Sequence, residues 1–283
     1  MAPFERGDLK KLQNVELSLL KWVQSVCEAH SLTYFLIEGS LLGAVRHQGF
    51  IPWDDDIDLG MPRQDYERFL KTAPALLPDH IRIVTYENAT GALRNFAQIE
   101  SGDVKVVFSA RETACVQNAW IDIFPLDWLP AGRLKRTWHL LRILVLRMRI
   151  QFSQFDQNVD IHRKNRPAYE RFLIWLYRKT RLGSKTDTKK LVLKLEALLK
   201  KYEQTEKSYC INASSAYKTR AVFPWRYYGS GRAYTFEGTQ VNGPLAYDEI
   251  LRRLYGDYMT PPPVGERNRH YTKVLSDPED FPS

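Results

Sequence analysis

Four carboxylates lie within five residues, in the segment Trp53-Asp54-Asp55-Asp56-Ile57-Asp58-Leu59. Two carboxylates about 5 Å apart repel each other by roughly 3 kcal/mol at an effective dielectric constant of about 20, so a partly buried cluster requires a cation. Hard divalent cations such as Mg²⁺ prefer oxygen ligands of this kind. The segment therefore predicts a site for Mg²⁺ or Mn²⁺, and its apolar residues argue against the alternative, a solvated acidic loop.

The spacing indicates which carboxylates bind the ion. If residues 56–59 form a strand, its two-residue period places Asp56 and Asp58 on one face, with Cα atoms about 6.5 to 7 Å apart. A third carboxylate, Asp122, interrupts the apolar run 120–124 and needs a partner if it is buried. An adjacent strand carrying Asp122 would complete a triad. The alternative for Asp122 is a structural role in which it accepts bonds from backbone amides.

A Gly-Ser pair precedes the acidic segment. Gly39 and Ser40 follow a strand-like run at 33–37 and open a short helical segment at 40–47. Glycine lets the backbone approach a phosphate closely, and the amide of Ser40 at a helix start offers a donor and a favourable dipole to an anion. The pair therefore predicts a phosphate-binding turn beside the acidic segment.

Helices and short strands alternate irregularly around these residues. An amphipathic helix is expected from Asp8 to about residue 29, and another begins after Pro62. Further strands are expected at 81–86 and 120–124, with a hairpin whose strands, 98–100 and 104–108, flank a turn at Gly102; Asp127 is expected in a loop. This order predicts an α/β chain of the α+β kind.

The positive charge of the chain is concentrated in one region. Residues 133–182 contain 13 Lys or Arg against 3 Asp or Glu, a local excess of +10 in a chain whose net charge is +8. Two basic amphipathic helices are expected there, one at 134–155 and one that begins at Pro167. Basic residues interleaved with Trp and Leu suit an anionic membrane surface, and an internally packed insertion is the alternative. The basic residues expected on the surface include Arg142, Arg147 and Arg149.

The composition of the chain limits the classes of protein to which it can belong. With 283 residues, of which 44% are apolar, the chain can bury a substantial core. Three widely spaced cysteines without metal-ligand spacing indicate a reducing compartment. The chain shows neither a signal-peptide layout nor an apolar run that could span a membrane, and no nucleic-acid motif accompanies its basic region. We therefore expect a cytoplasmic protein, peripheral at the inner face of the membrane if the basic helices bind lipid, with no nucleic-acid partner.

Several segments, in order along the chain, resemble one known family. They are 38–47, 50–61, 65–67, 122–127, 236–238 and 255–259, followed by Arg267 and His270. On these segments the chain resembles the LicD family of phosphotransferases, to which the fukutin-related proteins are related, within the nucleotidyltransferase-fold superfamily. The basic helical region is unmatched in detail, and Glu38 stands where a small or polar residue is expected.

The resemblance implies a nucleotidyltransferase-like mixed sheet flanked by helices. We expect a catalytic core at 1–130, a basic amphipathic helical insertion at 131–210, and a C-terminal part at 211–283 that completes the donor and acceptor site.

The resemblance also implies an activity. We expect metal-dependent transfer of phosphocholine from CDP-choline to a hydroxyl of a cell-surface glycan, such as teichoic acid, lipopolysaccharide or a lipid-linked glycan, with release of CMP. The alternatives are transfer of ribitol or glycerol phosphate from a CDP-polyol, nucleotidyl transfer from a nucleoside triphosphate, and a non-catalytic membrane adaptor. Asp56 and Asp58 would hold the metal, and Asp122 would bind it or accept the proton of the acceptor hydroxyl. The expected donor-binding residues are Gly39, Ser40, Arg46, His47, Arg267 and His270.

Overall fold

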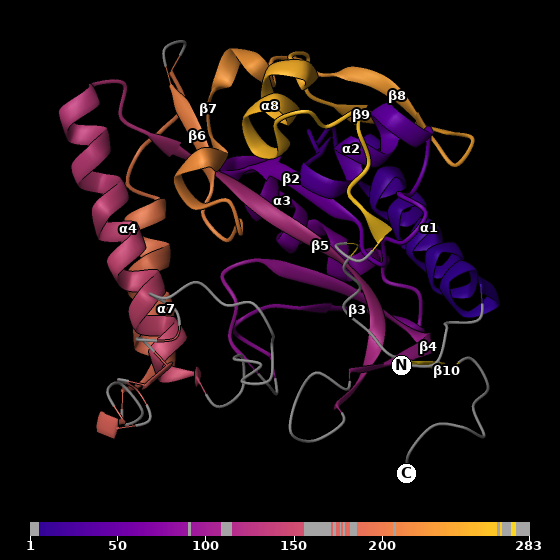
Figure 1. The fold of residues 1–283 in the computed structure, drawn as a ribbon, viewed down its shortest axis with the longest axis horizontal. Coiled ribbons are helices and arrows are strands. Elements are labelled where there is room, and N and C mark those ends of the chain that lie inside the picture. The colour runs from indigo at the N-terminus through magenta and orange to yellow at the C-terminus, as the bar shows by residue number, and fades with distance from the viewer. Residues whose placement is uncertain are drawn as a thin grey trace.

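The computed structural model describes residues 6–89, 92–108, 115–155, 171, 174–175, 177, 179–181, 186–205, 208–264, 267 and 273–275. A mixed sheet of eight strands forms its centre, with helices packed around it (Figure 1). The central order is β1-β2-β5-β4-β10, with β3 also beside β4, β6 beside β5 and β7 beside β6. The α+β class expected from the sequence is confirmed.

The helices are α1 (Arg6–Ala29), α2 (Glu38–His47), α3 (Arg63–Thr72), α4 (Arg133–Ser153), α7 (Thr188–Leu199) and α8 (Tyr247–Tyr255). The strands are β1 (Phe35–Leu36), β2 (Asp58–Pro62), β3 (Ile81–Val84), β4 (Ala97–Phe108), β5 (Cys115–Leu129), β6 (Tyr209–Asn212), β7 (Val222–Pro224), β8 (Arg232–Phe236), β9 (Thr239–Gly243) and β10 (Lys273–Leu275). The strands β8 and β9 form a separate two-stranded sheet.

The long strand β5 organises the sheet. Its first part pairs antiparallel with β4, its middle pairs parallel with β2, and its end pairs antiparallel with β6. Ile121, Ile123 and Leu126 of this strand are fully buried. Helix α1 packs on β4 and β5, and α3 packs on β2 and β5. The backbone of β5 is therefore fixed along its whole length, which makes it a rigid support for Asp122 and Asp127.

Two expectations about the strands are wrong. The segment 97–108 is one continuous strand rather than a hairpin, because the polar residues around Gly102 form a bulge with a register shift between Ser101 and Lys105. The amide of Gly102 donates to the carbonyl of His80 at 2.9 Å. Asp127 lies within β5 rather than in a loop, because the strand continues past Pro125.

Asp127 belongs to a buried ion cluster. Arg63 of α3 donates to both of its carboxylate oxygens, at 2.6 and 3.0 Å, and to Glu196 of α7 at 3.1 Å. Burial raises the pKa of both carboxyl groups, and the charge of Arg63 opposes that shift. The cluster ties the two helices to the central strand.

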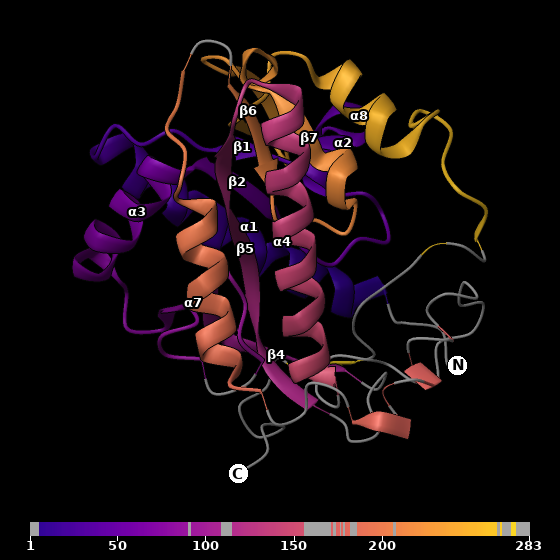
Figure 2. The same ribbon diagram turned by 90° about the vertical axis from the view of Figure 1, so that its left-hand side faces the viewer.

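The helices α4 and α7 lie side by side on one flank of the sheet (Figure 2). They enclose a second apolar cluster with the end of β5 and with β6. The basic helix expected at 134–155 is confirmed as α4. Most of the helix expected from Pro167 lies outside the described residues. Among the described residues, no helix combines the length and apolar character needed to cross a bilayer.

His139 of α4 makes the stability of this flank depend on pH. Its side chain is 2% exposed and meets the ring of Tyr202 edge-on, with centroids 4.8 Å apart. Burial, together with the charges of Arg142 and Lys201, lowers the pKa of His139 from 6.5 to about 4. Between about pH 4 and pH 6.5, the unfolded chain therefore binds a proton at His139 that the folded chain does not bind. The stability that is present above pH 6.5 is lost as the pH falls towards 4.

We expect acidification from about pH 7.5 to about pH 5 to lower the free energy of unfolding by about 2 kcal/mol through His139 alone. Urea unfolding of the wild type and of His139→Gln at both pH values measures this contribution as the difference between the two losses. Equal losses in the two proteins would show that His139 is not the sensitive group.

Candidate active site

The parallel pairing of β2 and β5 places two of the expected site residues opposite each other. Asp58 is the register partner of Asp122, and Leu59 is the partner of Ile123. The amide of Asp122 donates to the carbonyl of Ile57 at 2.9 Å, which extends this pairing beyond the start of β2. Two carboxylates that are 64 positions apart in the chain thus start from neighbouring strands at the same level of the sheet.

Asp56 reaches the site from a loop. The strand expected at 56–59 begins only at Asp58, so the two-residue period does not position Asp56. Its carboxylate gathers instead with those of Asp54 and Asp55, with one oxygen of each within 4.8 Å of the others. Gln13 of α1 holds this loop, since its side-chain amide donates to the carbonyl of Asp54 at 3.0 Å.

Two further carboxylates, Glu16 and Glu38, approach the same place. Glu16 of α1 is 1% exposed, and its Oε2 atom has no hydrogen-bond partner among the described residues. Glu38 begins α2 with a φ of 47° and accepts a bond from Asn212 at 3.0 Å. We call these seven carboxylates the acidic cluster: Glu16, Glu38, Asp54, Asp55, Asp56, Asp58 and Asp122.

Burial and mutual repulsion disfavour ionisation of three members of the acidic cluster, Glu16, Glu38 and Asp58. Burial raises the pKa of Asp58 well above its ordinary value, and the charges of Asp56, Glu38 and Asp122 add to the shift. Burial also raises the pKa of Glu38 to about 6. For Glu16, burial is again the main cause of a raised pKa, and the aspartates of the acidic loop contribute. A divalent cation would relieve this repulsion, so the donor set fits Mg²⁺ or Mn²⁺.

The Gly-Ser turn lies directly against the acidic loop. A Cβ atom added to Gly39 would lie 3.2 Å from Oδ2 of Asp54, so glycine permits this close approach. The hydroxyl of Ser40 is buried and accepts a hydrogen bond from the amide of Asp58 at 2.8 Å. Ser40 thus links the start of α2 to the start of β2. The turn joins an anion-attracting helix end to the carboxylates that fit a cation.

Basic side chains gather at the other end of α2. Nη1 of Arg46 donates to the carbonyl of Tyr258 at 2.6 Å, and its Nε donates to Nε2 of His47 at 2.9 Å. The guanidinium of Arg267 lies 4.1 Å from the ring centre of Trp53. Burial lowers the pKa of Arg46, and the charge of Arg267 contributes. Three of the expected donor-binding residues therefore share one region, whereas His270 lies outside the described residues.

Arg147, which the sequence predicts on the outer surface, lies close to the acidic cluster. It points inward from α4, and its Nη2 donates to the carbonyls of Ser214 and Ser215 at 3.2 and 3.0 Å. Its charge acts against the rise in the pKa of Glu38. The expectation that Arg147 lies on the surface is therefore wrong. It follows the buried Ile143 by one helical turn, which is the sequence signal for an inward position.

Two polar side chains on or next to β4 orient Asp122. Gln98 is its register partner and donates from Nε2 to Oδ1 of Asp122 at 2.8 Å. Arg94 in turn donates to Oε1 of Gln98 at 2.7 Å. No local pattern in the sequence indicates this contact, because it depends on the register of two paired strands. Glu16 did carry a signal, since it interrupts the apolar face of α1 between Leu12 and Leu20.

Comparison with known proteins agrees with this geometry. Residues 31–139 match the family model described as LicD/FKTN/FKRP, nucleotidyltransferase domain. The chain is 27% identical over 275 residues to a lipopolysaccharide cholinephosphotransferase LicD of Haemophilus influenzae, which covers 93% of this chain and 96% of that protein. It is also 51% identical over 45 residues to the human ribitol 5-phosphate transferase FKRP, which covers 16% of this chain and 9% of that protein.

The matched region contains the Gly-Ser turn, the acidic loop and the paired starts of β2 and the Asp122 segment of β5. The similarity to LicD extends beyond the matched domain and includes α4 and α7, because it covers 93% of the chain. Residues 31–139 thus match a nucleotidyltransferase domain of the LicD kind, and nearly the whole chain is similar to a LicD cholinephosphotransferase.

Proposed function

We propose that this protein transfers phosphocholine from CDP-choline to a hydroxyl of a cell-surface glycan and releases CMP, in a metal-dependent reaction. The observation that carries this proposal is the similarity, over 93% of the chain, to a protein named as a lipopolysaccharide cholinephosphotransferase. The acidic cluster supports metal dependence, because Glu16 and Asp58 are buried beside other carboxylates whose charges raise their pKa values, and a cation would relieve this repulsion.

We assign the metal to Asp56, Asp58 and Asp122. Two observations support this assignment. Asp58 and Asp122 are register partners on β2 and β5, and the charge of Asp56 contributes to the raised pKa of Asp58, as expected of a nearby carboxylate. When bound, Mg²⁺ or Mn²⁺ would offset negative charge on the diphosphate and on the departing CMP.

The other residues of the chain would bind and orient the reactants. The first turn of α2, with Gly39 and Ser40, offers backbone donors to one phosphate group, and Arg46 and Arg267 offer positive charge to another. Asp122, which Gln98 holds in place, would accept the proton of the acceptor hydroxyl if it lies within about 3 Å of that oxygen. Arg147 would limit the repulsion that Glu38 adds to the site.

Transfer of ribitol or glycerol phosphate from a CDP-polyol is the second candidate. It is favoured by the 51% identity to a ribitol 5-phosphate transferase over 45 residues. Both candidates use a CDP-linked donor and a hydroxyl acceptor. They differ in the group that is attached to the transferred phosphate.

A donor screen separates the candidates. The protein is incubated with Mg²⁺, a glycan acceptor and one of four donors, CDP-choline, CDP-ribitol, CDP-glycerol or CTP, and the release of CMP or pyrophosphate is measured. We expect CMP from CDP-choline and a mass increase of the acceptor by one phosphocholine group. A donor at about 100 times its dissociation constant should also add about 2.7 kcal/mol to the free energy of unfolding.

The other outcomes of the screen each contradict the proposal. CMP from a CDP-polyol alone would select the second candidate, and pyrophosphate from CTP would indicate nucleotidyl transfer. The absence of any product, together with no stabilisation by Mg²⁺, would indicate a non-catalytic adaptor.

A further inference from the structure

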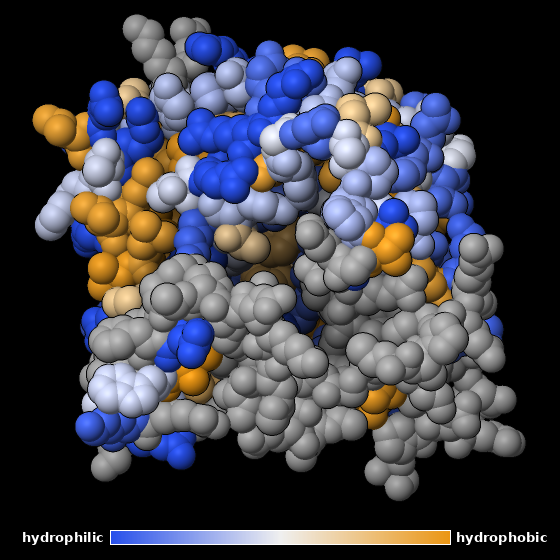
Figure 3. Space-filling view, viewed as in Figure 1, coloured by the Kyte–Doolittle hydropathy of each residue, from blue (hydrophilic) through white to orange (hydrophobic). Residues whose placement is uncertain are grey.

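The outward side of α4 carries a continuous stripe of exposed apolar side chains. They recur at steps of three and four residues, which places them on one face of the helix. Their exposed fractions lie between 44% and 87%, and they are Leu134, Trp138, Leu141, Val145 and Met148. Figure 3 shows apolar atoms gathered along the edge of the molecule at which α4 lies in Figure 1. Single exposed apolar residues are common, whereas a stripe of five is typical of an interaction surface.

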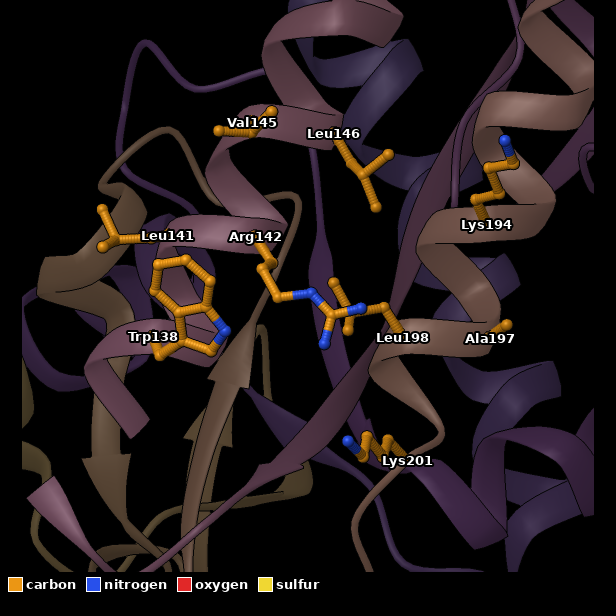
Figure 4. A pocket seen from close by; sticks show the side chains of 9 residues that line it. All are labelled: Trp138, Leu141, Arg142, Val145, Leu146, Lys194, Ala197, Leu198 and Lys201. Atoms are coloured by element: carbon orange, nitrogen blue, oxygen red, sulfur yellow. The ribbon is translucent and has the colours of Figure 1, made fainter. Parts of the chain in front are cut away.

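The stripe adjoins a groove between α4 and α7. The groove has a volume of about 720 Å³ and is lined by apolar side chains that include Leu146 and Leu198. Three basic side chains border it: Arg142, Lys194 and Lys201. Figure 4 shows Arg142 extending from α4 towards Leu198, with Lys194 and Lys201 on α7 and just beyond its end. We call the stripe and this groove together the α4–α7 face.

The α4–α7 face has no exposed negative charge from its two helices. The 21 residues of α4 include no Asp or Glu. The one acidic residue of α7, Glu196, is 6% exposed and bonds to Arg63 in the interior. Arg142 and Arg149 are exposed beside the stripe, and Lys189, Lys190 and Lys194 are exposed on α7. The α4–α7 face therefore combines an apolar surface with positive charge.

We infer that the α4–α7 face docks on the surface of an anionic lipid bilayer. Apolar side chains such as Trp138 and Leu141 would enter the boundary between headgroups and acyl chains, and the basic side chains would meet the lipid phosphates. A second copy of the chain is disfavoured as the occupant, because two such faces would bring positive charges together. The long stems of Arg142 and Lys201 allow their apolar parts to cover the groove while their charges reach the headgroups.

Vesicle flotation tests the inference with matched variants. The full chain is mixed with vesicles that contain anionic phosphatidylglycerol or only neutral phosphatidylcholine. We expect it to float with the anionic vesicles and to dissociate as salt is added. Leu141→Asp and Arg142→Glu should each weaken binding about tenfold. The controls are Leu245→Asp, at a site of similar exposure, 44% against 49% for Leu141, and Lys21→Glu on α1; both should bind as the wild type does.

Three outcomes would overturn the inference. They are no flotation with anionic vesicles, equal binding to neutral vesicles, and equal weakening by the control substitutions. A dimer in solution that Leu141→Asp dissociates, without vesicle binding, would assign the face to a second copy instead. Thermal unfolding checks that the variants fold. Transfer to a water-soluble acceptor should be unchanged in both face variants, which separates loss of docking from loss of the proposed reaction.

Discussion

Replacing Asp58 by asparagine is expected to lower the rate of transfer by about a thousandfold and, at the same time, to raise the melting temperature of the metal-free protein. The rate falls because the amide replaces an anionic ligand of the proposed metal. The melting temperature rises because burial and the neighbouring charges make an ionised Asp58 unfavourable in the folded state. The backbone amide that bonds Ser40 is unaffected by this substitution.

Two measurements on the same variant separate these effects. Differential scanning calorimetry with and without Mg²⁺ should show that the metal stabilises the wild type and has little effect on Asp58→Asn. CMP release measured in parallel gives the rate. Asp79→Asn, at an exposed position after α3, is the control and should behave as the wild type. An Asp58→Asn enzyme that works at the normal rate would remove Asp58 from the site.

Replacing Arg63 by methionine is expected to lower the free energy of unfolding by about 3 to 5 kcal/mol. Arg63 and Asp127 are almost fully excluded from solvent, with side-chain exposures of 7% and 0%. Without the guanidinium, Asp127 and Glu196 would remain buried without their main counter-charge. Their pKa values would rise further, so the loss would be largest above neutral pH.

Urea unfolding of Arg63→Met measures this loss. The control is Arg82→Met, since Arg82 pairs with Glu100 at 2.7 Å but its side chain is 65% exposed, and such pairs contribute about 1 kcal/mol or less. Adding Asp127→Asn to Arg63→Met should recover part of the stability by removing the buried charge. If Arg63→Met costs no more than Arg82→Met, the buried cluster does not stabilise the fold.

Helices and the existence of the acidic site followed from local patterns. The apolar period of α1, the start of α3 after Pro62 and the extent of α4 all depend on residues within a few turns of one another, which a single sequence records. The turn at Gly39 was recognisable for the same reason, whereas Asp56 was expected in a strand and lies in the loop before β2. Helix α2 starts at Glu38, only two residues earlier than expected.

Contacts between distant segments account for what the sequence did not reveal. Asp127 was misplaced because its partner Arg63 comes from another part of the chain, and a carboxylate paired in this way can lie within a strand. Arg147 was expected on the surface because it is basic, but it lies one helical turn after the buried Ile143 and bonds to the carbonyls of Ser214 and Ser215. The bonds from Gln98 to Asp122 and from Asn212 to Glu38 depend on the registers of β4, β5 and β6, which no local pattern specifies.

The parallel pairing of β2 with β5 affects the rate of folding, because it joins segments that are far apart in the chain. In the sequence, β3 and β4 lie between these two strands. The end of β5 pairs with β6, which comes after α4 and α7 in the chain. Strand β10, near the C-terminus, then pairs with the edge of β4. Such remote pairings make folding slow, so a nascent chain exposes unpaired strand edges until synthesis is nearly finished. We therefore expect truncated chains that end before β6 to aggregate. We also expect co-expressed chaperones to raise the recombinant yield more than substitutions of surface residues do.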